Sequence, residues 1–239
     1  MTRLLRLLSA ALLLLPTIGL AQQDWQTVQQ PATWANAFVD HAVSERTALW
    51  FDAHWRRMDL GGPPQQLLLR PGVQVTLRPG VRVGGGYAYI ATAPYGESPN
   101  AAPLREHRAW QQLTLGHTAL NLSLVHRLRS EQRWLAPVLG DDLGPLRYQQ
   151  RLRYFVRAQR PIASAAYGFA ANEFFLPVGH REGEQRRLQN RAQLGIGVPL
   201  SERQRLEIGY LHQWNRITPR ETHEINHTLV LSWVWVARR

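Results

Sequence analysis

Alternation of apolar and polar side chains dominates this sequence and is clearest in its last segment. Between residues 223 and 236 the odd positions are mostly apolar and end in Trp233 and Trp235, whereas the even positions are mostly polar or small, as at Glu224 and Asn226. A strict period of two over this length is typical of a β-strand whose two faces meet different surroundings. The segment therefore predicts a strand, and the same pattern recurs along most of the chain.

The alternating blocks and the turn residues between them predict about eleven strands. They lie near residues 34–43, 47–57, 65–77, 81–91, 106–117, 121–134, 146–159, 164–176, 186–199, 204–216 and 223–236. Tight connections (44–46, 78–80, 118–120, 160–162 and 201–203) alternate with longer ones (58–64, 92–105, 135–145, 177–185 and 217–222). A barrel in the bacterial outer membrane has this asymmetry, because its periplasmic turns are short and its outer loops are long.

The predicted fold is an all-β, antiparallel, up-and-down transmembrane β-barrel over residues 34–239, preceded by an N-terminal segment or extra strand over 22–33. Bacterial single-chain barrels normally have an even number of strands. We therefore expect twelve strands, within a range of ten to twelve, with residues 24–30 supplying the additional strand or two of the segments forming one. A soluble periplasmic barrel or sandwich has the same period with an apolar interior, and it is the alternative.

The content of the polar faces favours the membrane barrel over the soluble alternative. Between 146 and 158 the face opposite the apolar one carries Arg147, Arg151, Arg153 and Arg157. Aromatic residues stand toward strand ends, as in the girdles of membrane barrels; they are Trp55, Tyr87, Tyr89, Tyr148, Trp214 and Trp233.

The first residues predict export from the cytoplasm. Arg3 and Arg6 precede an apolar run over 7–15, and small residues follow up to Ala21. This is the pattern of a signal peptide over residues 1–21, and its apolar run is shorter than the roughly 20 residues that span a bilayer. We expect the mature chain in the outer membrane of a Gram-negative bacterium, with outer-membrane lipids and the barrel-assembly machinery as partners; its oligomeric state stays open.

The amino-acid composition excludes several kinds of functional site. The chain has no cysteine, which excludes disulfides, thiolate metal sites and a cysteine nucleophile. Its net charge is +11, and all of its basic side chains other than histidine are arginine. A soluble nucleic-acid-binding protein can carry such a charge. The signal peptide and the placement of the arginines along alternating strands argue against nucleic acid as a partner.

One motif matches the zinc-protease pattern, with His223, Glu224 and His227 in the order H-E-x-x-H. That chemistry needs a helix, because positions i and i+4 must meet on one face to share a metal ion. In an alternating strand the two histidines would be ~13 Å apart at about 3.3 Å per residue. We therefore predict no metal site, no cofactor and no catalytic residue here.

A second stretch, from Tyr210 to Asn215, faintly resembles the His-x-Ser-Asn segment of outer-membrane lipid deacylases and phospholipases. Gln213 and Trp214 follow His212 where a serine nucleophile would have to stand. We expect an interfacial histidine beside an aromatic anchor, and a lipid-modifying enzyme is a minor alternative.

The run Gly84-Gly85-Gly86 lies in the middle of an alternating segment, and no lysine follows it. A phosphate-binding loop is therefore not indicated, and we expect a bend or a close approach of strands at this point.

Arginines on the polar faces are the most informative set for function. We predict a lumen network made of Arg127, Arg129, Glu131, Arg133, Arg147, Arg151, Arg153, Arg157, Arg187, Arg191, Arg205, Glu207 and Glu224. Arg56, Arg70, Arg82, Arg108, Asp40 and Asp52 share the polar faces. We expect Glu207 and Glu224 to face each other across the 217–222 connection, where either can bridge Arg205 or Arg191.

Two functions fit this network. An arginine–glutamate network that fills the lumen predicts a structural or accessory barrel, and this is the interpretation that we favour. An excess of arginine predicts instead a small anion-selective channel, because rings of arginine favour anionic solutes. Small anions are then the expected ligands.

Several motifs resemble one bacterial outer-membrane family. The run R-L-R-S-E-Q-R-W over 127–134 is followed by R-L-R-Y over 151–154, A-N-E-F-F over 171–175, Q-N-R over 189–191, L-E-I-G-Y over 206–210 and the closing N-H at 226–227. Together they resemble the family called domain of unknown function 2490, over most of the chain from about Trp34 onward. The resemblance implies an outer-membrane barrel and brings no established activity, ligand or catalytic residue.

Overall fold

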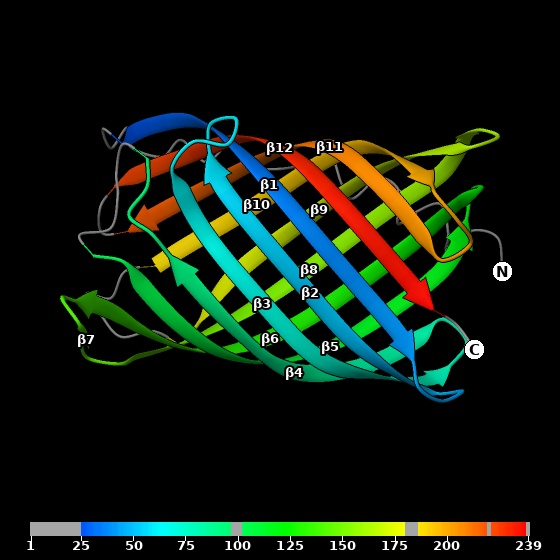
Figure 1. The fold of residues 1–239 in the computed structure, drawn as a ribbon, viewed down its shortest axis with the longest axis horizontal. Coiled ribbons are helices and arrows are strands. Elements are labelled where there is room, and N and C mark those ends of the chain that lie inside the picture. The colour runs from blue at the N-terminus through cyan, green and yellow to red at the C-terminus, as the bar shows by residue number, and fades with distance from the viewer. Residues whose placement is uncertain (1–24, 97–101, 180–185, 219–220, 238–239) are drawn as a thin grey trace, which may run out of the picture.

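Eleven long strands form a closed barrel in the computed structural model, which describes residues 25–96, 102–179, 186–218 and 221–237 (Figure 1). The strands are β1 (Gln26–Ala42), β2 (Thr47–Met58), β3 (Pro64–Arg78), β4 (Val81–Thr92), β5 (Leu104–Ala119), β6 (Leu122–Leu139), β8 (Arg147–Ala163), β9 (Ala166–Val178), β10 (Arg186–Pro199), β11 (Gln204–Thr218) and β12 (Thr222–Ala237). The predicted all-β barrel is confirmed, and each predicted segment corresponds to one of these strands. The expected signal peptide lies outside the described residues.

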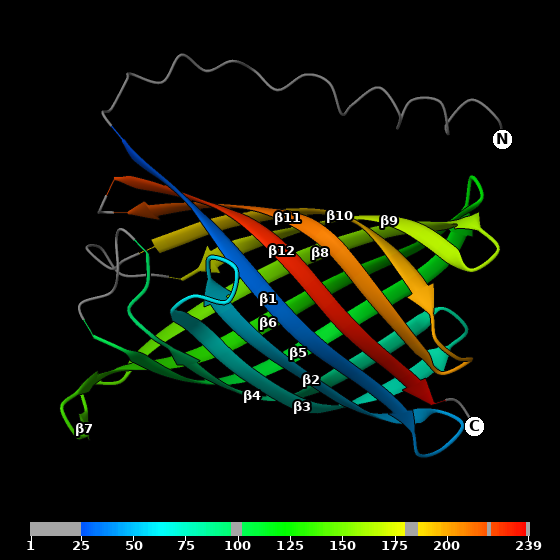
Figure 2. The same cartoon turned by 45° about the horizontal axis from the view of Figure 1, so that its top comes forward.

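Neighbouring strands along the chain pair antiparallel, with β6 paired to β8, and the barrel closes between β1 and β12. This closing pair is parallel, with Gln26 beside Thr222 and His41 beside Ala237. Figure 2 shows β1 and β12 running side by side in the same direction. The parallel seam follows from the strand number, because an up-and-down chain with an odd number of strands ends in the direction in which it began.

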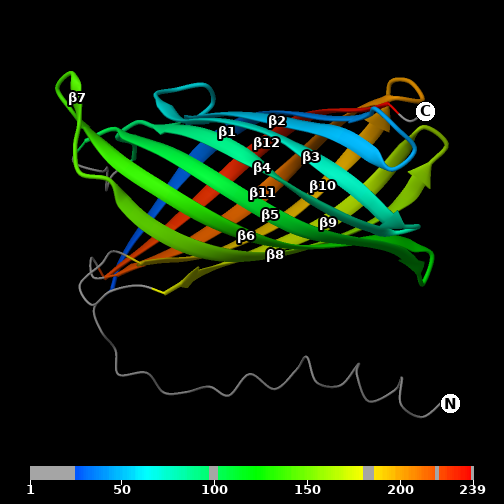
Figure 3. The same ribbon diagram turned by 90° about the horizontal axis from the view of Figure 1, so that it is seen from below.

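The strand number lies within the expected range of ten to twelve. Residues 24–30 were expected to supply a separate twelfth strand, but 26–30 are the first part of β1. The twelfth strand is β7 (Asp142–Leu143), which pairs only with the end of β6. The β6–β7 hairpin projects beyond the rim of the barrel (Figure 3). The expected fully antiparallel barrel is therefore a mixed one, with a single parallel pair.

The two ends of the barrel differ in their connections. At one end, called the turn end here, the connections are 43–46, 79–80, 120–121, 164–165 and 200–203. At the other, called the loop end, they are 59–63, 93–103, 140–146, 179–185 and 219–221. The last of these is shorter than predicted, because β11 and β12 both extend further toward each other. β1 begins at the loop end, as the alternation of short and long connections requires.

Apolar side chains cover the outside of the barrel. Large apolar residues with more than a third of their surface exposed occur on every barrel strand except β1, among them Leu49, Leu113, Leu194 and Ile208. The inside holds most of the buried polar side chains, such as Asp52, Arg129 and Asn226. This is the reverse of a soluble barrel, whose interior is apolar. Among the described residues, no helix is long and apolar enough to cross a bilayer.

A smaller apolar cluster packs inside the barrel around Trp110 of β5. Leu68, Ala88 and Ile90 surround its buried indole ring. Gly72 and Gly86 lie beside the same ring, and a Cβ atom on Gly72 would overlap its Cζ2 atom. The triple glycine is therefore a place of close approach, as predicted, since Gly86 leaves room for both the ring and the neighbouring backbone of β3.

We predict that Gly72→Ala destabilises the barrel by about 1–3 kcal/mol, because the added methyl group forces the Trp110 ring out of its place. Unfolding in denaturant, followed by the gel mobility of unheated samples, measures the change. Gly116→Ala is the matched control, because the nearest atom to a Cβ there is the carbonyl oxygen of Leu124 at 3.9 Å. Equal effects at the two glycines would contradict the explanation.

Candidate functional site

Glu131 of β6 is the centre of the charged network inside the barrel. Its side chain is fully buried. Arg151 Nη2 and Arg153 Nη1 of β8 lie 2.5 and 2.6 Å from its two carboxylate oxygens, and Arg108 Nη1 of β5 lies 3.2 Å away. Hydrogen bonds between charged groups are stronger than neutral ones, and a carboxylate with donors from two flanking strands is held in one geometry. Glu131 therefore ties β5, β6 and β8 together inside the barrel.

Two further carboxylates extend this network along the wall. Glu106 of β5 accepts bonds from Arg133 Nε and Nη2 at 2.7 and 2.9 Å, and it also pairs with Arg108. Glu173 of β9 pairs with Arg127 Nη2 at 2.9 Å and with Arg153 Nη2 at 2.8 Å. The result is a continuous chain of alternating charge, which runs Arg133, Glu106, Arg108, Glu131, Arg153, Glu173, Arg127.

The sequence reasoning missed Glu106 and Glu173 as members of the network. Alternation contained the signal for both. Glu106 stands two positions from Arg108, and Glu173 two positions from the buried Phe175, so each shares its strand's inward face. The predicted members Arg127, Glu131, Arg133, Arg151 and Arg153 are all brought together by the structure.

A second cluster lies nearer the turn end, around Glu207 of β11. Arg157 donates from Nη1 and Nη2 to its two oxygens at 3.0 and 2.8 Å. The Tyr167 hydroxyl donates at 2.7 Å, and Arg205 Nε lies 3.3 Å away. The forked contact from β8 to β11 fixes the carboxylate across the lumen.

Glu224 lies at the opposite end of the barrel from Glu207. In the β11–β12 ladder Glu207 pairs with Ser232, whereas Glu224 pairs with Asn215. The expectation that the two acids face each other is therefore wrong, because the hairpin register sets them many residues apart along the strands. Glu224 accepts a bond from Gln30 at 3.1 Å and faces Arg187 at 3.8 Å.

Near Glu224, Tyr95 from the β4–β5 connection reaches into the loop end of the lumen. Arg187 Nη1 donates to its hydroxyl oxygen at 3.4 Å. Burial raises the pKa of the Tyr95 hydroxyl above its ordinary value, so that this group stays neutral at the mouth of the lumen.

The other acids on the inward faces have their own arginines. Asp52 is fully buried and accepts bonds from Arg70 Nε, Trp50 and His54. Asp40 near the turn end is bound by both terminal nitrogens of Arg82. Of the predicted network residues, Arg147 lies apart, because it is exposed at the start of β8 near the loop-end rim.

Three inward arginines have no carboxylate partner among the described residues: Arg56, Arg129 and Arg191. Neutral groups hold them instead. Arg129 donates two bonds to Gln112 and lies over the Trp110 ring at 4.9 Å. Arg56 and Arg191 both lie over the ring of Trp34, at 3.9 and 4.8 Å from its centroid. Cation–π contacts of this kind partly offset the cost of burying a charge.

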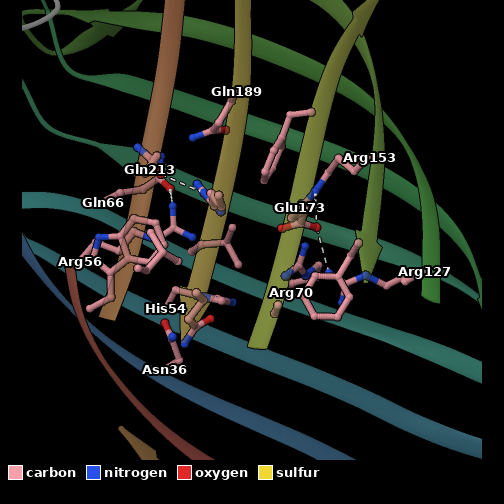
Figure 4. A pocket seen from close by; sticks show the side chains of 18 of the residues that line it. Asn36, His54, Arg56, Gln66, Arg70, Arg127, Arg153, Glu173, Gln189 and Gln213 are labelled. Atoms are coloured by element: carbon pink, nitrogen blue, oxygen red, sulfur yellow. Dashed lines mark hydrogen bonds and ion pairs between the residues drawn. The ribbon is translucent and has the colours of Figure 1, made fainter. Parts of the chain in front are cut away.

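Arginines and aromatic rings alternate across the lumen from β2 to β8. Arg191 lies over Phe175 at 4.6 Å as well as over Trp34, and Arg153 lies over the same Phe175 at 4.4 Å. Figure 4 shows Arg56, Gln66 and Gln213 on one side of this group and Arg153 and Glu173 on the other. The stack therefore links Arg56, which has no carboxylate partner, to the ion-paired Arg153 on the other side of the lumen.

A cavity of about 660 Å³ runs beside the network. Its lining includes Asp40 and Val236 near the turn end and Tyr95 and Gly179 near the loop end. Eleven arginines line it, against four carboxylates. The fully buried Glu131 and Arg129 are not part of the lining, so the packed network occupies one wall and leaves the space beside it open. The surplus of positive charge faces that space.

The histidines of the two enzyme-like motifs lie on the outward face. His227 Nδ1 shares a hydrogen bond with the Tyr210 hydroxyl at 2.6 Å, and His223 stacks on Trp25. His212 pairs in register with Ala192 and His227, and its ring meets His227 edge-on. Gln213 points to the lumen, where it binds Arg191. Within the described part of the chain, no cluster of three or more potential ligands is placed to hold a metal ion.

Comparison with known proteins shows which family this chain is similar to. An uncharacterized protein of Methylorubrum extorquens is 29% identical over 243 residues, which cover 97% of this chain and 98% of that protein. The sequence profile of the family described as "Protein of unknown function (DUF2490)" matches residues 32–224, from β1 to β12, and includes every carboxylate of the network. The chain therefore belongs to the DUF2490 family.

Proposed function

We propose that this protein is an outer-membrane β-barrel of a Gram-negative bacterium, whose arginine–glutamate lumen holds the barrel in one rigid shape. The distribution of side chains, which is the reverse of that in a soluble barrel, supports a location in the outer membrane. Apolar residues cover the outside, where lipid would contact them, and charged residues pack inside. A closed barrel also satisfies its backbone hydrogen bonds between strands, which a membrane requires.

The main support for a network that keeps the barrel rigid is the burial of Glu131 among guanidinium groups from two flanking strands. A carboxylate without solvent must keep such partners, because an unpaired buried charge is costly. The network thus cross-links β5, β6, β8 and β9 from the inside. A barrel cross-linked in this way resists collapse, which suits an accessory or structural component of the membrane.

A second candidate function is a small anion-selective channel. The cavity favours it, because residues from both ends line one continuous space and eleven arginines face four carboxylates there. Arginines that line a pore attract anions and repel cations. A lipid-modifying enzyme receives less support, because the register neighbours of His212 are Ala192 and His227 rather than a nucleophile.

Location is tested by membrane fractionation combined with gel mobility before and after boiling. We expect the mature protein in the outer-membrane fraction, with a shift in mobility on boiling. Recovery as a soluble periplasmic protein without such a shift would rule out the membrane barrel.

Conductance in planar bilayers separates the two candidate functions. A purely structural barrel is expected to pass no current above the bare membrane. A channel is expected to show small, anion-selective steps, because the lining carries a surplus of arginine. Cation-selective current would contradict both functions.

A further inference from the structure

Arg56 of β2 is buried and Arg191 of β10 is partly buried, and neither has an ion-pair partner among the described carboxylates. Both guanidinium groups lie within 5 Å of the centroid of the Trp34 ring, so they occupy one region of the cavity although their strands are not neighbours. Arg56 is only 8% exposed. Two like charges near each other in a confined space repel, and an isolated buried charge is expensive.

Most of the terminal nitrogen donors of these two side chains have no hydrogen-bond partner among the described residues. Arg56 Nη1 donates to the amide oxygen of Gln66 at 2.7 Å, and its buried Nε has no hydrogen-bond partner in the structure. Arg191 donates from Nε to the amide oxygen of Gln213 at 2.9 Å. Each arginine therefore has one neutral amide as its hydrogen-bond acceptor, whereas a guanidinium group offers five donors.

Trp34 lies against both guanidinium groups, and Phe175 lies against Arg191 as well. We therefore expect a ligand to approach the edges of these groups. A planar guanidinium edge matches the two oxygens of a carboxylate or phosphate. Arg56, Arg191, Gln66 and Gln213 all line the cavity. Its volume of about 660 Å³ is in the range of small-molecule sites.

We propose that Arg56 and Arg191, backed by Trp34 and flanked by Gln66 and Gln213, form a binding site for a small oxyanion. The ligand is a carboxylate or a phosphate group that offsets the positive charge of Arg56 and Arg191. This inference rests on the proposed function in that it needs a water-filled lumen inside a membrane barrel, but it does not need conduction.

The site is tested by ¹⁹F NMR of the full mature chain refolded in detergent micelles. Trifluoroacetate probes the carboxylate and monofluorophosphate the phosphate. We expect saturable line broadening with at least one of them. Arg56→Gln and Arg191→Gln should each weaken it at least tenfold. Arg147→Gln is the matched control, because it removes an arginine outside the lumen, and it should leave the broadening unchanged.

A variant that fails to give the heat-modifiable folded band is replaced by Arg56→Lys or Arg191→Lys. Lysine keeps the positive charge but loses the forked edge, so broadening should still fall. Broadening that is absent with both probes, or that is equal in the wild-type chain and all folded variants, would overturn the site. A barrel that inserts into the membrane but binds neither probe would defeat this inference and leave the proposed function standing. A protein that never shows the folded membrane band would defeat the proposed function itself.

Discussion

Glu131→Gln is expected to destabilise the barrel by about 3–5 kcal/mol, the cost typical of breaking a buried ion pair from one side. The neutral amide cannot balance the arginines that pair with Glu131, which are Arg108, Arg151 and Arg153 together with Arg70 at 4.0 Å. Their charges would then repel one another without solvent to screen them. In a conducting lumen the same substitution should also strengthen anion selectivity.

The measurement is unfolding by guanidinium chloride in micelles, followed by tryptophan fluorescence and by heat-modifiable mobility. Glu202→Gln is the matched control, because Glu202 lies exposed in the turn between β10 and β11 and should change stability little. Glu207→Gln should also lower stability, because it leaves Arg157 without its forked partner. A loss at Glu131 no larger than that at Glu202 would mean that the network does not stabilise the barrel.

Leu194→Arg is expected to cost about 2–4 kcal/mol in the proposed membrane barrel, the penalty for arginine facing lipid near the midplane. Leu194 lies well inside β10, points outward and is 65% exposed to the surroundings of the barrel. Ile196→Arg should behave similarly for the same reason. Insertion into lipid vesicles, followed by gel mobility, measures the loss.

The neighbouring change Gln193→Arg provides the matched control. Gln193 lines the cavity on the opposite face of the same strand, so an arginine there meets water and other polar groups rather than lipid. It should insert normally. Failure of the Gln193 variant together with normal insertion of the Leu194 variant would mean that the inward and outward faces have been exchanged.

Most of the fold could be predicted because alternation and turn chemistry act locally. A strand with two different faces leaves a period-two record in its own residues, so segments such as β10 and β12 were found within a few positions. The closure of the barrel does not produce a pattern of this kind within any one segment of the sequence. The parallel seam depends on how β1 meets β12, and the even-number expectation derives from other barrels rather than from these residues.

The candidate site was predictable only as a set of inward arginines. Parity along a strand shows which face a side chain takes, and this placed Glu131 and Arg153 correctly inside. Partnership depends on register between strands that are distant in sequence, and a shift of register moves every pair. This is why Glu207 and Glu224 were wrongly paired, and why the stack of Arg56, Trp34 and Arg191 was not foreseen.

The parallel seam also places the start of β1 and the end of β12 at opposite ends of the barrel. In an even, antiparallel barrel the first and last residues meet at one rim, and a short linker can join them to make a circular permutant. Here β1 starts at the loop end and β12 finishes at the turn end, with sixteen paired positions between them. A linker between these two points would have to cover about 50 Å along the barrel, at roughly 3.3 Å per residue. A circular permutant that joins β12 to β1 would therefore need a linker that spans the whole length of the seam.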